Sequence, residues 1–66
     1  MTVYENDKGT QWFVDEAFYY HSGWMIYRKT LNRKPVATGY FYFTEKDAQK
    51  EFNKMAQRKG WKKVEE

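Results

Sequence analysis

Residues 36–61 read VATGYFYFTEKDAQKEFNKMAQRKGW, a run of strand-forming residues that passes directly into a helical pattern. The part from 36 to 43 is rich in β-branched and aromatic residues, which favour strands. Thr44 is followed three residues later by Asp47, a spacing that resembles the capping box of a helix N-terminus. This stretch therefore predicts a strand followed by a capped helix.

The helical pattern is amphipathic and has a clear end. Its apolar residues recur at helical spacing on one face: Ala48, Phe52, Met55 and Ala56. Gly60 is typical of a left-handed helix stop, and an apolar residue just past such a stop often packs on the last turn. We therefore expect Trp61 to fold back on the helix.

Three segments before this stretch also read as strands. Residues 24–29 (Trp-Met-Ile-Tyr-Arg-Lys) and 10–18 contain aromatic and β-branched residues, and 3–5 is a short segment of the same kind. Turn-forming residues at 6–9 separate 3–5 from 10–18, and others at 30–35 separate 24–29 from the strand that begins at 36. The sequence leaves open whether 3–5 forms a strand.

Strands that precede a single helix indicate the α+β class. We expect a three- or four-stranded antiparallel sheet followed by one C-terminal helix packed on one sheet face. The 66 residues allow one domain. Residues 1–61 are assigned to it and 62–66 to a polar tail.

The composition narrows the function classes. The chain has no cysteine, which excludes disulfides and thiolate metal sites, and it has fourteen aromatic residues (three Trp, six Tyr and five Phe). It has no apolar run near 18 residues and no basic, apolar N-terminal stretch, so we expect neither a membrane span nor a signal peptide. These features predict a cytoplasmic protein with no membrane partner.

The usual chemistry of enzymes is missing. His21 is the single histidine and lies in a turn, and a metal site needs three or four clustered ligands. Asp15 and Glu16 are neighbours on an expected strand, so they point to opposite faces and cannot act as an acid–base pair. We expect no enzymatic activity, no metal and no cofactor.

One helix can cover only one face of the sheet, and strand alternation divides the aromatic residues between two faces. We expect the helix to cover Trp12, Val14, Trp24, Ile26, Phe41 and Phe43. The other face then carries Phe13, Met25, Tyr27, Tyr40 and Tyr42, with Lys29 at its end. A register shift of one residue would exchange the two faces.

This second face is a candidate binding surface for nucleic acid. The net charge is +3, and residues 23–43 contain four basic residues and no acidic one. Aromatic side chains stack bases, and cations bind phosphates. The candidate site consists of Met25, Tyr27, Arg28, Lys29, Arg33, Lys34, Tyr40 and Tyr42.

A protein-interaction module is the alternative, because interfaces are enriched in Tyr, Trp, Met and Arg. Such a module would regulate or inhibit a host protein, or form a homodimer through the aromatic face. The sequence identifies neither the partner nor the oligomeric state, and it does not distinguish single- from double-stranded nucleic acid.

Residues 24–55 resemble in outline the DNA-binding domains of the AP2 and arm-type integrase kind, which consist of a three-stranded sheet and a helix. The similarity rests on Trp24, the basic residues of 28–34, the aromatic strand 40–43 and the Thr-x-x-acid-Ala sequence of 44–48. The resemblance implies DNA binding through the sheet, although tyrosines stand here where those domains carry arginines. The chain also resembles small phage or prophage accessory proteins in its general character.

Overall fold

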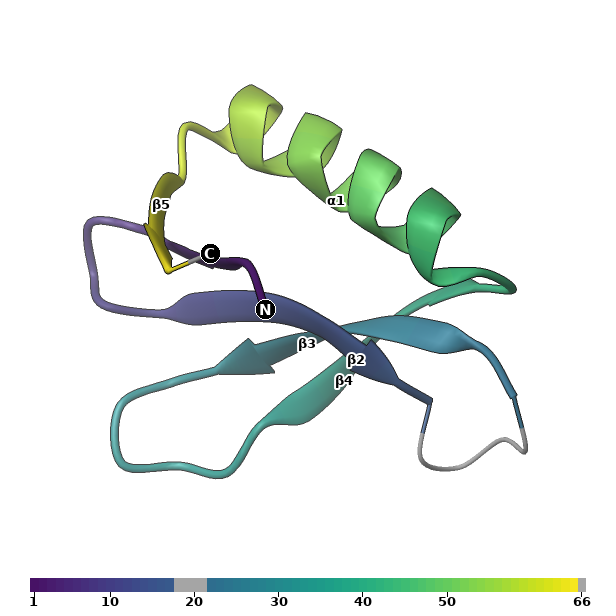
Figure 1. The fold of residues 1–66 in the computed structure, drawn as a ribbon. Coiled ribbons are helices and arrows are strands. Elements are labelled where there is room, and N and C mark those ends of the chain that lie inside the picture. The colour runs from purple at the N-terminus through teal and green to yellow at the C-terminus, as the bar shows by residue number, and fades with distance from the viewer. Residues whose placement is uncertain (18–21, 66) are drawn as a thin grey trace.

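The computed structural model describes residues 1–17 and 22–65 (Figure 1). Within these residues, five strands and one helix follow one another: β1 (Val3–Glu5), β2 (Gln11–Glu16), β3 (Trp24–Lys29), β4 (Val36–Tyr42), α1 (Glu45–Lys59) and β5 (Lys62–Glu65). The expected end of the second strand at Phe18 and the lone His21 lie outside the described residues. The α+β class is confirmed.

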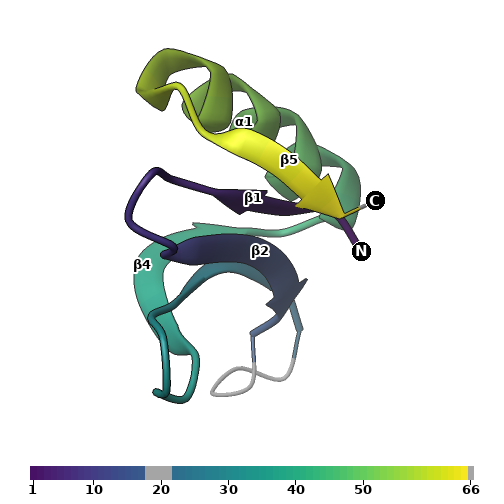
Figure 2. The same ribbon diagram turned by 90° about the vertical axis from the view of Figure 1, so that its left-hand side faces the viewer.

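The strands form one antiparallel sheet in the order β4-β3-β2-β1-β5. The predicted number of three or four strands is wrong, because residues 3–5 and 62–65 both pair. The segment assigned to a polar tail is strand β5, which lies beside β1, so the two ends of the chain are neighbours (Figure 2). All four β5 side chains are exposed, so backbone pairing rather than burial holds this strand.

The helix begins and ends as its sequence predicts. The Thr44 hydroxyl accepts a hydrogen bond from the backbone N–H of Asp47 at 3.1 Å. At the other end Gly60 takes a left-handed conformation with φ of 73°. The N–H groups of Gly60 and Trp61 donate to carbonyls of the last turn, at 3.3 Å and 3.0 Å, which completes a Schellman motif.

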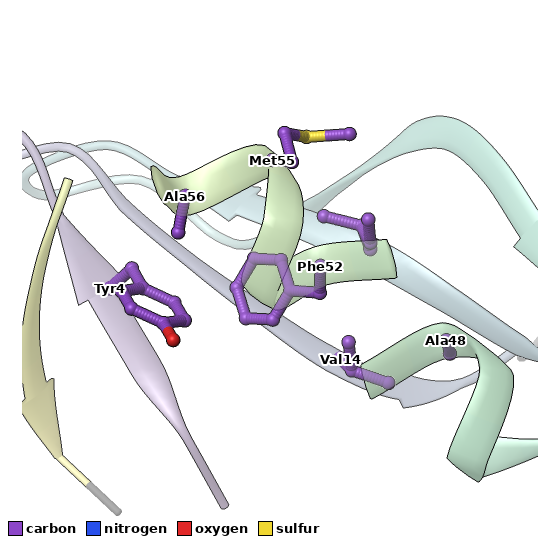
Figure 3. Close-up of a cluster of buried hydrophobic side chains, with 7 residues drawn as sticks. Tyr4, Val14, Ala48, Phe52, Met55 and Ala56 are labelled. Carbon is purple, nitrogen blue, oxygen red and sulfur yellow. The ribbon is translucent and has the colours of Figure 1, made fainter. Parts of the chain in front are cut away.

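The main core lies between α1 and the sheet, on what we call the helix side (Figures 1 and 3). It consists of Tyr4, Val14, Ile26, Ala48, Phe52, Met55 and Ala56. Phe52 is fully buried, and the Tyr4 ring meets it edge-on with 5.1 Å between ring centroids. The Tyr4 hydroxyl also donates to Asn53 Oδ1 at 2.9 Å, so one residue of β1 ties the sheet to the helix.

Trp61 folds back as expected and extends this core beyond the helix end. Its ring stacks on Trp12 with centroids 3.8 Å apart and an interplanar angle of 10°. The centroid of the same ring lies 6.4 Å from the centroid of the Phe52 ring. Trp61 therefore links the chain between α1 and β5 to strand β2.

A second, smaller cluster lies on the opposite face of the sheet, the far side. Ala17, Met25 and Tyr27 are buried there, and Phe13 and Phe41 pack against them. The Phe13 and Tyr27 rings stack with centroids 5.6 Å apart, and the Tyr27 hydroxyl donates to the Glu16 carbonyl at 2.6 Å. Figure 2 shows β2 and β4 as curved ribbons, and the turn that leads into β4 projects away from α1.

The face assignment is right for β2 and β3 and wrong for β4. Tyr42 lies opposite Trp24 and packs against the helix-side core, whereas Phe41 lies opposite Met25 and joins the far-side cluster. Phe43, which we expected under the helix, is 85% exposed. Strand β4 also bulges, because its register with β3 shifts between Met25 and Tyr27.

Candidate nucleic-acid interface

The hairpin between β3 and β4 brings three of the predicted basic residues together. Its turn is closed by a hydrogen bond from the Arg33 N–H to the Thr30 carbonyl at 3.1 Å, with Asn32 in a left-handed conformation. Beside this turn is a hollow of about 410 Å³, lined by Arg28, Thr30, Arg33, Lys34 and Val36. No acidic side chain lines the hollow, so its net charge is positive and suits an anionic ligand.

The cations of this hollow are free to meet a ligand. Arg28, Arg33 and Lys34 are all exposed. Within residues 1–17 and 22–65, none of the three forms an ion pair with a carboxylate; Lys54 and Glu51 do so on the helix surface, at 3.5 Å. Exposed, unpaired cations in one place raise the local potential for phosphate binding.

Two of the predicted tyrosines lie on the same side of the sheet as this hollow. Arg28 lies opposite Val36, and both belong to the helix side because Ile26 and Tyr42 do. Tyr40 is 52% exposed and precedes Tyr42 by two residues on the same strand. A band of cations and tyrosines therefore runs along β4 from the hairpin toward the start of α1.

The environment of Tyr42 supports this placement. Burial raises the pKa of the Tyr42 hydroxyl above its ordinary value of 10.0, and the carboxylate of Glu51 and the Tyr40 hydroxyl raise it further. Arg58 acts in the opposite direction and lowers the pKa. The Tyr42 hydroxyl thus lies near two charged residues of α1 and near Tyr40, on the helix side of β4.

The other predicted site residues are not part of this band. Met25 and Tyr27 are only 6% and 4% exposed, because they form the far-side cluster, so they cannot stack bases on a surface. Lys29 is half-buried and lies one residue beyond Arg28, on the far side. We call the remaining set the Tyr–Arg surface: Arg28, Arg33, Lys34, Tyr40 and Tyr42.

Sequence reasoning missed Val36 and Arg58 as neighbours of this surface. Val36 lines the basic hollow, and Arg58 approaches Tyr42 from the last turn of α1. The sequence assigned Arg58 to the polar part of the helix, away from its apolar face, so it gave no signal that Arg58 lies near β4.

The far side also has an opening. A groove of about 420 Å³ is lined by Phe13, Asp15, Tyr27 and residues 34–37. Lys34 and Val36 border both this groove and the basic hollow, so the two lie on either side of the β4 edge.

Metal and membrane chemistry find no support in the part of the chain that the structure describes. Among residues 1–17 and 22–65, no group of three or more His, Cys, Asp or Glu side chains is placed to hold a metal ion. Over the same ranges, no helix has the length and the apolar character needed to cross a membrane. The Tyr–Arg surface remains the clearest candidate site.

Comparison with known proteins found no matching family model, no matching curated protein and no matching solved structure.

Proposed function

We propose that this protein is a non-enzymatic nucleic-acid-binding module that uses the Tyr–Arg surface. The observation that carries the proposal is the basic hollow, in which Arg28, Arg33 and Lys34 converge without a neutralising carboxylate. Phosphate contacts of this kind supply most of the sequence-independent affinity for nucleic acid. The AP2-like and integrase-like resemblance agrees with binding at the β3–β4 hairpin.

Single-stranded nucleic acid fits this surface better than a duplex. Exposed tyrosines offer flat faces on which unpaired bases stack, at about 1–3 kcal/mol for each base. Tyr40 is the most available of them, since half of its surface is exposed and it lies along the strand from the basic hollow. Bases paired inside a duplex do not present their faces in this way.

The proposal is tested by fluorescence anisotropy with short single- and double-stranded oligonucleotides at several salt concentrations. Three phosphate contacts predict a salt slope of about −2 for a single strand, which corresponds to roughly a 20-fold loss of affinity between 50 and 200 mM salt. Reversing the charges of Arg33 and Lys34 to Glu should abolish binding. No binding at low salt, or a salt-independent affinity, would remove the proposal.

A matched control separates the hollow from overall charge. Lys46→Glu with Lys50→Glu changes two exposed cations of α1, neither of which lines the hollow. Both double variants lower the net charge of +3 by four, to −1. The control should keep most of the affinity that the hairpin variant loses; equal losses would mean that net charge alone attracts the nucleic acid.

Stacking has a separate test. Tyr40→Ala should weaken single-strand binding by about 1–3 kcal/mol, whereas Tyr40→Phe, which keeps the ring, should retain it. Because Tyr40 is exposed, both variants should unfold near the wild-type temperature. Equal affinities for the Ala and Phe variants would limit the site to phosphate contacts.

A further inference from the structure

Strand β4 is an edge of the sheet, and it is unusually exposed for a strand of this length. It has one neighbour, β3, and none of its seven residues is buried on either face. In β3, by comparison, three of six residues are buried. The backbone groups on the outer edge of β4 are thus available to pair with another strand.

The edge contains a bulge and follows Pro35, but it carries none of the charged side chains that protect many edge strands from pairing. No residue from Val36 to Tyr42 carries a charge. The opposite edge, β5, contains Lys62, Lys63 and Glu65, and charged side chains of this kind blunt an edge strand. The two edges of this sheet therefore differ in chemistry: one is charged and the other is apolar.

Exposed apolar side chains gather along the same edge. In the described ranges, six large apolar residues are exposed, and four of them lie within β4 or beside it: Leu31, Val36, Tyr40 and Phe43, at 80%, 48%, 52% and 85%. An exposed apolar patch of this kind usually has a partner.

The charges that flank β4 indicate which partner fits. The residues before it, 28–34, contain four basic side chains and no acidic one. At the start of α1, residues 45–51 contain three acidic residues and two lysines, a net charge of −1. If β4 pairs antiparallel with β4 of a second copy, each basic hairpin lies beside the acidic helix start of the other copy. Parallel pairing would place the two basic hairpins side by side, where they repel.

We propose that β4 pairs with β4 of a second copy of this chain, which joins two five-stranded sheets into one antiparallel sheet. The contact is self-complementary, as a two-fold dimer requires. Gly39 is the middle residue of β4 and lies in the bulge with a φ of 96°, so the two backbones meet at the axis at a position that has no side chain to separate them.

This dimer does not depend on nucleic acid, but it brings Glu45 and Asp47 of the second copy beside Arg33 and Lys34, so its contacts use part of the Tyr–Arg surface. A two-fold axis perpendicular to the sheet leaves both helix sides facing the same way, so the two basic hollows also lie on one side of the joined sheet. Dimer formation is measured with the protein alone. Its failure is therefore distinct from a failure of the proposed function.

The first experiment measures mass against concentration by sedimentation equilibrium, with two matched variants. Val36 on β4 and Val64 on β5 are 48% and 50% exposed, so Lys at either position should leave the fold intact, and circular dichroism checks this. We expect the wild type to rise from 8.1 kDa toward twice that mass. Val36→Lys should raise the dissociation constant at least about tenfold, and Val64→Lys should change it little.

Three results would overturn the proposal: a monomer at every concentration up to about 1 mM, a dimer broken by Val64→Lys, or equal effects of the two variants. A charge exchange tests the orientation. Arg33→Glu with Lys34→Glu removes the net positive charge of the hairpin and places carboxylates next to both ends of β4, and Glu45→Lys with Asp47→Lys makes both flanks basic. Each variant alone should be monomeric at concentrations where their mixture dimerises; a mixture that stays monomeric refutes the antiparallel arrangement.

Discussion

Phe52 is the residue whose truncation tests the packing of α1 on the sheet most directly. Its side chain is fully buried, its ring meets Tyr4 edge-on at 5.1 Å, and the ring of Trp61 lies 6.4 Å away. Replacing a buried Phe by Ala costs about 3–5 kcal/mol. The lost aromatic contacts add roughly 0.5–1.5 kcal/mol beyond area, so we expect a value in the upper half of the 3–5 kcal/mol range.

This loss is large relative to the stability of the whole domain. At about 0.05–0.15 kcal/mol per residue, 66 residues give a free energy of unfolding of roughly 3–10 kcal/mol. Phe52→Ala should therefore remove a large part of this free energy of unfolding. Phe52→Leu, which conserves most of the volume, should cost less than about 1.5 kcal/mol and remain folded.

Urea unfolding followed by tryptophan fluorescence measures these changes, because Trp61 and Trp12 report on the same core. Phe43→Ala is the matched control: it removes the same side chain from a position that is 85% exposed, and it should change stability by no more than about 0.5 kcal/mol. The comparison is made at low protein concentration. A loss below about 1 kcal/mol for Phe52→Ala, or equal losses at both positions, would refute the helix packing described here.

Two other predictions concern Tyr42 and the glycines. The pKa of Tyr42 is raised in the folded protein, so its contribution to stability is complete below pH 10.0 and is lost as pH rises through the folded pKa; Tyr42→Phe should reduce the loss of stability between pH 9 and pH 11 in urea titrations, and an unchanged pH dependence would contradict this. Gly60→Ala should cost roughly 1 kcal/mol, since φ is 73° and an added Cβ meets nothing within 4 Å. Gly23→Ala should cost clearly more, because φ is 111° and the added Cβ overlaps the ring of Phe41; equal melting temperatures for the two variants would show that the ring moves aside.

The sequence predicted α1 correctly because the signals that define a helix are local. The cap at Thr44, the apolar face and the stop at Gly60 lie within one continuous segment, and each acts through residues a few positions away. The bounds of Trp24–Lys29 were predicted correctly for the same reason, whereas the sequence left open whether Val3–Glu5 forms a strand.

The facing of β4 could not be predicted from its alternation. Tyr and Phe alternate from 40 to 43, so both faces of this strand are aromatic and neither is clearly the buried one. The structure resolves the choice through position: β4 is an edge strand, and its Tyr42 packs against the core under α1, where Glu51 raises the pKa of the Tyr42 hydroxyl and Arg58 lowers it. Apolar character alone favoured Phe41 and Phe43 and gave the wrong face.

The sequence correctly predicted that basic residues of the candidate site lie together, and it incorrectly predicted that Met25 and Tyr27 are exposed. The basic residues of the hairpin were found because they are adjacent in the chain, and three of the four line one hollow. Met25 and Tyr27 were included because an uncovered sheet face was expected to be exposed. The second cluster, with Ala17 and Phe13, buries them instead.

Strand β5 was missed because its pairing is remote in the sequence. Residues 62–65 contain one apolar residue, Val64, and no local signal distinguishes such a segment from a polar tail. Its partner β1 lies at the other end of the chain, and pairing between segments so far apart leaves no periodic pattern in either.

The pairing of β1 with β5 also sets an order of events in folding. Val3 and Glu65 are partners separated by 62 positions, whereas Glu16 and Trp24 in the β2–β3 hairpin are separated by 8. Closing the longer loop directly costs about 1.8 kcal/mol more in chain entropy, from the logarithmic dependence on loop length. Since the exposed β5 strand has little burial to offset this cost, it should join last and open first. Amide hydrogens of 62–65 should therefore exchange with solvent well before those of β3, and each opening leaves the outer edge of β1 briefly bare.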